Sequence, residues 1–478
     1  MFMRMVYDEN LAQAAYIIGC QRAGEAIVFD PERDVDRYID IAKSQGLKLV
    51  AAAETHIHAD FLSGSRELAE RVGAKVYLSD EGDADWKYQW LDKKSGGGSY
   101  DHVLLKDGNT FTLGAIEFKA IHTPGHTPEH LCYLVTDRGS GADEPIGLVS
   151  GDFLFVGDLG RPDLLETAAG HAGAMEPSAK RLYQSLQVLN DLPDFVQVWP
   201  GHGAGSACGK SLGAIPTSTI GYERRFNPAL RAATGEQAFV DFILSGQPEP
   251  PMYFARMKRD NKMGPKVLGA LPTPSRIKHT QLAELNTRRA AVIDTRPWPA
   301  FRAGHVPGSL SLPLGKPFPT DAGSLIGEDE PITLIVEASR LDEAVRQLVR
   351  IGLDDIRGWM EPRDLDAFAG AGHALATIED VTTDQAAAML TDGKARVLDV
   401  RRASEYAQGH LPGAVNIAHT RLPGRLDEAP KEQTLIVHCQ GGWRSARAAS
   451  YLKRHGYHVV NLPGGYAEWA AAGRPVGA

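Results

Sequence analysis

The sequence predicts an α/β protein with several domains, and three observations support this prediction. The chain has 478 residues, which corresponds to about three domains of ordinary size. Short apolar runs alternate with amphipathic helical segments in the first half, a pattern that is typical of α/β folds. The second half contains one sequence pattern twice, which indicates a duplicated domain.

The first domain is expected over residues 1–245, where strand and helix signals alternate. One helix is predicted at 35–46, ending at Gly46, and another at 177–192, where Pro177 suits the first helical turn. The apolar runs that predict strands lie at 14–19, 25–30, 47–55, 115–123, 131–136 and 145–152.

Two copies of a smaller α/β domain are expected after a connector at 246–275. The connector is rich in proline and charge, but its Tyr253 and Phe254 predict that it packs against a domain. After it, AVIDTRPWPAFRAGHVPGSLSLPL and RVLDVRRASEYAQGHLPGAVNIAH share a strand, an Asp-x-Arg motif, a helical turn, Gly-His-x-Pro-Gly and a second strand. We call residues 276–372 the first repeat and residues 373–478 the second repeat.

The composition of the chain argues against several function classes. It has 51 basic and 60 acidic side chains and a formal net charge of −9, which disfavours a nucleic-acid partner. The four cysteines are too few and too scattered for a disulfide framework, so reduced thiols in the cytoplasm are expected. The sequence predicts neither a signal peptide nor a membrane-spanning helix. We also expect a homo-oligomer.

Histidine and aspartate side chains follow four of the predicted strands, in the motifs THIHADF, HTPGHTPEH, SGD and VWPGHG. In α/β folds, ligands bind beyond the carboxyl ends of the strands. Small residues beside these side chains allow the backbones to approach, so the set predicts a metal site rather than isolated polar groups. The side chains are His56, His58, Asp60, His122, His126, His130, Asp152 and His202.

The motifs THIHADF, TPGHT, SGD and GRPDL resemble those of the metallo-β-lactamase superfamily, and within it those of the persulfide dioxygenase branch. The resemblance covers about the first half of the chain. It implies an αββα sandwich with one Fe(II) per chain, held by His56, His126 and Asp152. It also implies that Arg161 and Asp163 of GRPDL lie near the iron.

The same resemblance identifies residues that are expected beside the ligands. His58, Asp60 and His202 match positions that hold metals in two-metal hydrolases, and here they are expected outside the ligand set. Phe61 stands where the hydrolase pattern has another histidine, so the second metal lacks a ligand. Two histidines and one carboxylate suit non-haem Fe(II) oxygen chemistry, whereas hydrolysis uses a metal-bound hydroxide. A mononuclear zinc site remains an alternative.

The second repeat contains a candidate nucleophile in IVHCQGGWRSARAASYL. Cys439 follows a predicted strand and precedes a predicted helix, so backbone N–H groups of the loop can converge on its sulfur. Arg444 adds positive charge. With the flanking LDVRRASEYAQGHLPGA and LPGGYAEW, the loop resembles the active-site loop of rhodaneses, which implies sulfur transfer through a Cys439 persulfide. Between Cys439 and Arg444 the loop contains Gln440, Gly441, Gly442 and Trp443.

The position equivalent to Cys439 in the first repeat and the remaining candidate thiol, Cys208, are interpreted differently. In the first repeat, Ala338 stands at the position of Cys439, and SRLDEA replaces the glycine loop, so this copy is expected to be catalytically inactive. Cys208 follows His202 in a glycine-rich stretch with Lys210 nearby, and we interpret it as a buried, free cysteine. An exposed auxiliary thiol, activated by Lys210, is the alternative interpretation.

The whole chain resembles persulfide dioxygenase–rhodanese fusion proteins of bacterial sulfide detoxification. The resemblance implies oxidation of a small thiol persulfide, such as that of glutathione or coenzyme A, by O2 to sulfite and thiol. The rhodanese domain would then form or consume thiosulfate. Two alternatives remain open: a glyoxalase-II-like zinc thioesterase fused to a rhodanese, and a non-catalytic thiol-based sulfur carrier or sensor.

Overall fold

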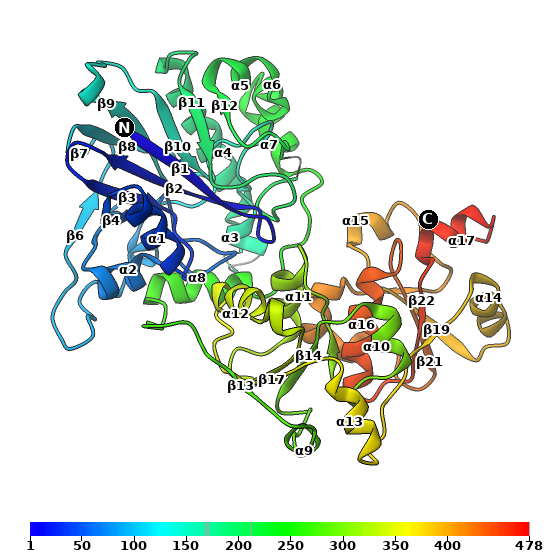
Figure 1. Ribbon diagram of the computed structural model, residues 1–478. Helices are drawn as coiled ribbons and strands as arrows, with labels where there is room; N and C mark the ends of the chain where they lie inside the picture. Colours follow the sequence, from blue (N-terminus) through cyan, green and yellow to red (C-terminus); the bar gives the residue numbers. More distant parts are fainter. Residues whose placement is uncertain (168–169, 171, 211, 478) are drawn as a thin grey trace. The chain divides into compact units, whose positions relative to one another are not determined.

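The computed structural model describes residues 1–167, 170, 172–210 and 212–477 (Figure 1). The chain divides into two compact units. Unit 1 comprises Met1–Leu271 and Val349–Gly352, and unit 2 comprises Pro272–Leu348 and Leu353–Ala478. Most of the expected connector therefore belongs to unit 1, and nearly all of both repeats belongs to unit 2.

Unit 1 contains two six-stranded sheets in which strands that are consecutive in the sequence are neighbours. The first sheet contains β1 (Phe2–Asp8), β2 (Gln13–Cys20), β3 (Glu25–Phe29), β4 (Lys48–Ala53), β5 (Lys75–Ser79) and β6 (His102–Leu105). The second contains β7 (Thr110–Leu113), β8 (Ile116–His122), β9 (Leu131–Asp137), β10 (Gly147–Gly151), β11 (Gln197–Pro200) and β12 (Ser218–Thr219).

Apolar side chains between the two sheets form the core of unit 1. One buried cluster combines residues of β2, β3 and β4 with residues of β8, β9, β10 and β11. Within it, the ring of Phe29 lies 5.4 Å from that of Phe118 and 5.1 Å from that of Tyr133. Strand β2 is buried along its whole length, because its opposite face also packs on a helix layer.

Helices cover the outer face of each sheet. Helices α1 (Asp36–Ser44) and α2 (Ser65–Val72) share a buried cluster with the first sheet. Helices α4 (Met175–Ser185) and α7 (Glu236–Leu244) do the same for the second sheet. The layers thus follow the order helix, sheet, sheet, helix, which is the expected αββα sandwich.

The remaining helices of unit 1 lie mainly in its C-terminal third (Figure 1). They are α3 (Leu164–Thr167), α5 (Ile220–Phe226), α6 (Pro228–Ala232) and α8 (Phe254–Met263). The aromatic residues of the expected connector are buried, as the sequence indicated: Tyr253 is 4% exposed and Phe254 is 1% exposed.

Unit 2 contains two five-stranded parallel sheets with the same strand order. The first repeat has the order β13-β17-β16-β14-β15, and the second has β18-β22-β21-β19-β20. These strands are β13 (Ser275–Arg276), β14 (Ala291–Asp294), β15 (Leu310–Ser311), β16 (Ile332–Ile335), β17 (Ile356–Met360), β18 (Glu379–Asp380), β19 (Ala395–Asp399), β20 (Val415–Asn416), β21 (Thr434–His438) and β22 (Val459–Leu462).

The helices of unit 2 alternate with these strands, as expected where parallel strands need crossover connections. The first repeat has α9 (His279–Ala283), α10 (Trp298–Ala303), α11 (Phe318–Leu325), α12 (Leu341–Arg350) and α13 (Asp364–Gly370). The second has α14 (Thr383–Thr391), α15 (Ala403–Tyr406), α16 (Trp443–Arg454) and α17 (Gly465–Ala471). Within the described residues, no helix is both long enough and apolar enough to cross a bilayer.

Candidate metal centre and cysteine loop

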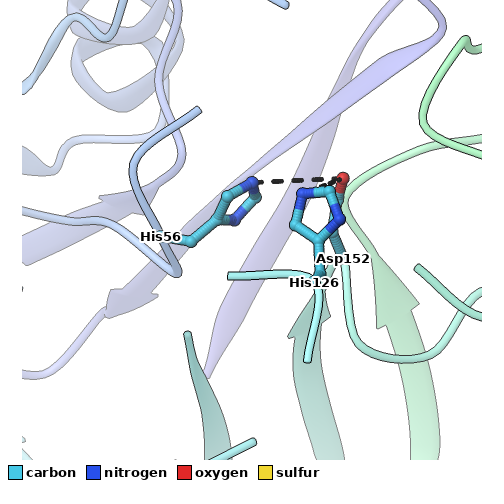
Figure 2. Close-up of side chains that lie close together, drawn as sticks. All are labelled: His56, His126 and Asp152. Atoms are coloured by element: carbon cyan, nitrogen blue, oxygen red, sulfur yellow. Dashed lines mark ion pairs between the residues drawn. The ribbon is translucent and has the colours of Figure 1, made fainter. Parts of the chain in front are cut away.

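Three side chains from separate loops of unit 1 converge on one point (Figure 2). The loops follow β4, β8 and β10, and they supply His56, His126 and Asp152. The Nε2 atom of His56 lies 4.0 Å from Asp152 Oδ2, and that of His126 lies 3.4 Å from the same oxygen. One potential ligand atom from each residue lies within 4.8 Å of the other two.

The other ring nitrogen of each histidine is used for orientation. His56 Nδ1 lies 2.9 Å from Thr55 Oγ1, and this hydroxyl donates to Asp30 Oδ2 at 2.9 Å. The hydroxyl proton is thereby used, so His56 Nδ1 carries a proton. His126 Nδ1 donates to the carbonyl of Arg161 at 3.0 Å. In both rings Nε2 is left unprotonated and faces Asp152, as metal ligation requires.

The backbone around Asp152 is also constrained. Its N–H donates to His130 Nε2 at 3.0 Å, so His130 orients the carboxylate loop rather than acting as a ligand. Two other loops approach Asp152 closely because they have glycine at the point of contact. A Cβ at Gly160 would lie 1.7 Å from the Asp152 carbonyl oxygen, and a Cβ at Gly201 would lie 2.7 Å from Asp152 Oδ1.

The electrostatics of the three side chains fit a metal ion. Burial raises the pKa of Asp152 to about 6, and neither carboxylate oxygen has a hydrogen-bond partner in the described part of the chain. Burial also lowers the pKa of His126 to about 4 and that of His56 well below its ordinary value, so both imidazoles are neutral. A buried carboxylate with two bare oxygens costs free energy unless a cation compensates it. The three residues therefore form a candidate metal-binding triad.

His58 contacts two buried carboxylates outside the triad. Its Nε2 lies 3.1 Å from both Asp30 Oδ1 and Glu54 Oε2. Burial opposes the charged form of His58, but the two carboxylates together hold its pKa well above the ordinary value. His58 is thus an imidazolium paired with buried acids. Phe61 is fully buried, and its ring centroid lies 4.4 Å from that of His58.

Asp60, His202 and Cys208 form a second group beside the triad. His202 Nε2 lies 3.4 Å from Asp60 Oδ2 and 3.5 Å from Asp152 Oδ1. Cys208 is 2% exposed, and burial followed by the charges of Asp60 and Asp152 raises its thiol pKa well above the ordinary value. Lys210 donates instead to the carbonyls of Phe242 and Ser245. The structure therefore confirms the favoured interpretation of Cys208 as a buried cysteine, and the alternative of an exposed thiol is wrong.

Arg161 connects the triad to two other segments. Its guanidinium pairs with Asp163, with Nε to Oδ1 at 3.0 Å and Nη2 to Oδ2 at 2.6 Å. It also donates to the carbonyl of Ala207, next to Cys208, at 2.9 Å and to that of Pro248 at 2.6 Å. Because its carbonyl accepts from His126, Arg161 supports the triad, and its own fully buried side chain is held by these four hydrogen bonds.

Asn261 on α8 is a positioning residue that the sequence did not reveal. It is 2% exposed and binds the loop that carries His56. Its Nδ2 donates to the carbonyls of His58 at 2.8 Å and Phe61 at 2.7 Å, and its Oδ1 accepts from the N–H of Ser63 at 2.8 Å. About 200 residues of sequence separate the two segments, and no local pattern in α8 marks this contact.

We predict that Asn261→Ala weakens metal binding. The substitution leaves two buried carbonyls and one buried N–H unpaired, at a cost of about 1–3 kcal/mol each. We expect the metal affinity of the apoprotein to fall about tenfold or more, measured by titration with Fe(II) or Zn(II) under anaerobic conditions.

The exposed Asn190 supplies a matched control, because its side chain bonds only at the surface, to Gln187. Asn190→Ala should leave both metal affinity and the free energy of unfolding unchanged. Equal metal affinity in Asn261→Ala and Asn190→Ala would contradict the role given to Asn261.

In unit 2, the cysteine loop joins β21 to α16. Cys439 is fully buried, and the N–H of Gly442 donates to its Sγ at 3.1 Å. Gly442 has φ of 90°, and a Cβ there would lie 2.3 Å from the carbonyl oxygen of Pro463. Only glycine fits this position, which turns a backbone N–H toward the sulfur.

Charged side chains around this loop are paired. Arg444 makes a bidentate ion pair with Glu405, at 2.6 and 2.7 Å, so its charge is partly balanced. Arg401 is held by Asp399 and lies 3.4 Å from Gln440 Oε1. Trp443 is 46% exposed, and Gln440 and Gly441 of the same loop are also exposed.

In the first repeat the corresponding segment has a different conformation. After β16 the chain forms a short 3-10 turn, Ala338–Arg340, which continues into α12. Arg340 pairs with Glu343 in this turn, at 2.7 Å. The segment provides neither a thiol nor the glycine loop, which agrees with the expected loss of sulfur chemistry.

Comparison with known proteins assigns both ends of the chain. Residues 9–202 match the metallo-beta-lactamase superfamily, and residues 382–472 match the rhodanese-like domain. Among solved structures, a metallo-beta-lactamase from Staphylococcus aureus subsp. aureus COL has a TM-score of 0.67 and 41% sequence identity. This likeness covers 76% of the present chain and 99% of that chain.

Two curated relatives illustrate the range of the superfamily. The beta-lactamase hydrolase-like protein of Agrobacterium fabrum is 28% identical over 50% of this chain, which spans only 54% of that protein's length. The mitochondrial persulfide dioxygenase of Bos taurus is 23% identical over 49% of this chain and 78% of its own. Together with the triad and the cysteine loop, these matches show that the chain belongs to the metallo-β-lactamase superfamily and carries a C-terminal rhodanese-like domain.

Proposed function

We propose that the first domain oxidises a small thiol persulfide with O2 and that the second repeat transfers sulfur through Cys439. The observation that carries the first half is the triad of two neutral histidines and one buried carboxylate. Such a set leaves open positions on an iron, the arrangement used in non-haem Fe(II) oxygen chemistry. The likeness to the Bos taurus persulfide dioxygenase supports this choice of reaction.

The oxidation balances as RSSH + O2 + H2O giving RSH, HSO3⁻ and H⁺. An Fe(II) held by His56, His126 and Asp152 would supply the O2 activation. The chain's own residues bury this site, because all three side chains are at most 3% exposed. Holding the persulfide and O2 side by side in such a place supplies much of the rate acceleration by proximity.

The sulfur transfer uses the product of this oxidation. The Cys439 thiolate takes the outer sulfur of a second RSSH and releases the thiol RSH. Sulfite then attacks the outer sulfur of the Cys439 persulfide, the S–S bond breaks, and thiosulfate leaves while the Cys439 thiolate is restored. In the opposite direction, Cys439 takes the outer sulfur of thiosulfate and releases sulfite, and a thiol removes this sulfur as a persulfide. The N–H of Gly442, donated to Sγ, stabilises the thiolate in either direction. Joining both activities in one chain raises the local concentration of the shared intermediates.

A second candidate function is favoured by one observation, the group of Asp60, His202 and Cys208. These residues offer oxygen, nitrogen and sulfur ligands, and His202 lies 3.5 Å from Asp152 Oδ1. A second ion there would create the two-metal arrangement that hydrolases use. We prefer the single iron, because Phe61 supplies an apolar ring where the hydrolase pattern has a ligand.

The first prediction for this function concerns the metal. We expect one iron per chain, and His56→Ala, His126→Ala and Asp152→Ala should each lose the iron and the O2 uptake. The physical reason is that each substitution removes one of the three ligands, and the two that remain bind the iron too weakly to hold it. An oxygen electrode run with glutathione persulfide, paired with metal quantification, checks this expectation.

The control for these variants is His122→Ala, on a half-buried histidine whose Nε2 donates to the carbonyl of Pro128. This variant should retain iron and O2 uptake. Two zinc ions per chain together with cleavage of thioesters would instead establish the hydrolase.

The second prediction separates the two activities. Cys439→Ser should abolish sulfur transfer from thiosulfate to thiol, because a hydroxyl cannot form a persulfide. It should leave O2 uptake with a supplied persulfide unchanged, so the variant accumulates sulfite where the wild type yields thiosulfate. Ion chromatography of sulfite and thiosulfate provides the measurement.

Cys20→Ala serves as the control, since Cys20 is a buried residue of β2. It should yield thiosulfate like the wild type. Equal thiosulfate formation by Cys439→Ser, after correction for the spontaneous reaction of sulfite with persulfide, would refute the assignment to Cys439.

A further inference from the structure

The first repeat has no cysteine loop, yet it contacts the helix that follows the loop of the second repeat. Three side chains of α16 make these contacts, at spacings of three and four residues that place them on one helix face. Ser450 Oγ accepts from the N–H of Ser311 at 3.0 Å. Arg454 Nε donates to the carbonyl of Thr287 at 2.8 Å. The third side chain, Arg447, lies nearest to the loop.

Arg447 is held by a buried carboxylate of the first repeat. Asp321, on α11, is 1% exposed. Its Oδ2 accepts from Arg447 Nε at 2.5 Å, and its Oδ1 lies 3.0 Å from Nε2 of His419. His419 begins a 3-10 segment of the second repeat. One carboxylate of the first repeat therefore binds two side chains of the second.

Both of these side chains adjoin Trp443. The guanidinium carbon of Arg447 lies 5.0 Å from the centroid of the Trp443 ring, and Arg447 Nη1 donates to the Trp443 carbonyl at 2.7 Å. The ring of His419 lies 6.0 Å from that of Trp443 at an interplanar angle of 74°. Trp443 directly follows Gly442, whose N–H binds the sulfur of Cys439.

We propose that the first repeat is a positioning module for sulfur transfer, and that Asp321 is the residue through which it acts. By fixing Arg447 and His419, Asp321 sets the position of Trp443 and of the first turn of α16. Trp443, which is exposed together with Gln440 and Gly441, is then part of the surface that an incoming sulfur acceptor meets. This inference rests on the proposed sulfurtransferase function.

The alternative is that Asp321 only holds the two repeats together. A buried carboxylate costs free energy unless it is paired, so its loss also affects stability. The chain offers a matched pair that separates these roles. Glu330 of the first repeat forms an ion pair with Arg454, at the far end of α16 from Cys439. Removing this charge weakens the same contact between repeats without touching Trp443.

The experiment compares Asp321→Asn with Glu330→Gln in the full chain. Asn keeps the size of the side chain but loses its charge, so the variant is expected to fold. We expect kcat/KM for transfer from thiosulfate to thiol to fall about tenfold or more in Asp321→Asn, since small displacements at a reacting centre are costly. Glu330→Gln should remain within about twofold of the wild type, with a similar loss of thermal stability.

A second measurement reports on Trp443 itself. Acrylamide quenching of its fluorescence is obtained by subtracting the signal of the corresponding Trp443→Phe protein. Quenching of Trp443 should increase in Asp321→Asn and stay unchanged in Glu330→Gln. Wild-type quenching in Asp321→Asn, or equal losses of transfer in both variants, would overturn the proposal. If the wild type transfers no sulfur, the proposed function fails, and the quenching still decides the role of Asp321.

Discussion

The candidate metal centre of unit 1 depends on the burial of one carboxylate, that of Asp152. Among the described residues its two oxygens have no hydrogen-bond donor, and burial holds its pKa near 6. A carboxyl group in such a place either ionises next to a cation or stays protonated. The fold provides the place by bringing loops of both sheets together, with glycines where side chains would collide. A metal ion bound by the triad would complete this charge balance.

Hydrogen bonds outside the triad decide how its ligands point. His56 depends on Thr55 and Asp30, His126 on the carbonyl of Arg161, and the loop of His56 on Asn261. Such outer contacts fix the tautomer of each imidazole and the position of its ring. They also explain why α8 belongs to unit 1. The segment expected to be a connector supplies part of the support for the metal centre.

Unit 2 stabilises negative charge by other means. At Cys439 the sulfur receives a backbone N–H at the start of a helix, and the nearby Arg444 is already paired with Glu405. The first repeat shares the strand order of the second, because both have the same buried strand pattern, while its loop has lost the thiol and the glycines. Its helix α11 nevertheless retains a buried carboxylate bound to the second repeat. The first repeat thus lacks the cysteine loop but packs against the second repeat through a buried carboxylate.

The sequence by itself determined the α/β class, the duplication and the candidate ligands, because each depends on local order along the chain. Apolar runs predict strands, the repeated motif predicts repeated sheets, and a histidine at a strand end predicts a site at that edge. The identity of His56, His126, Asp152 and Cys439 as candidates followed from these motifs.

Only the tertiary structure decided which polar groups share a partner. His58 pairs with Asp30, Asn261 binds the loop that carries His56, and Asp321 contacts His419. All three contacts join segments that are distant in the sequence. Each of these contacts depends on how sheets and helices pack, and a few ångströms of packing decide whether a donor reaches its acceptor. Spacing along a chain records none of these distances.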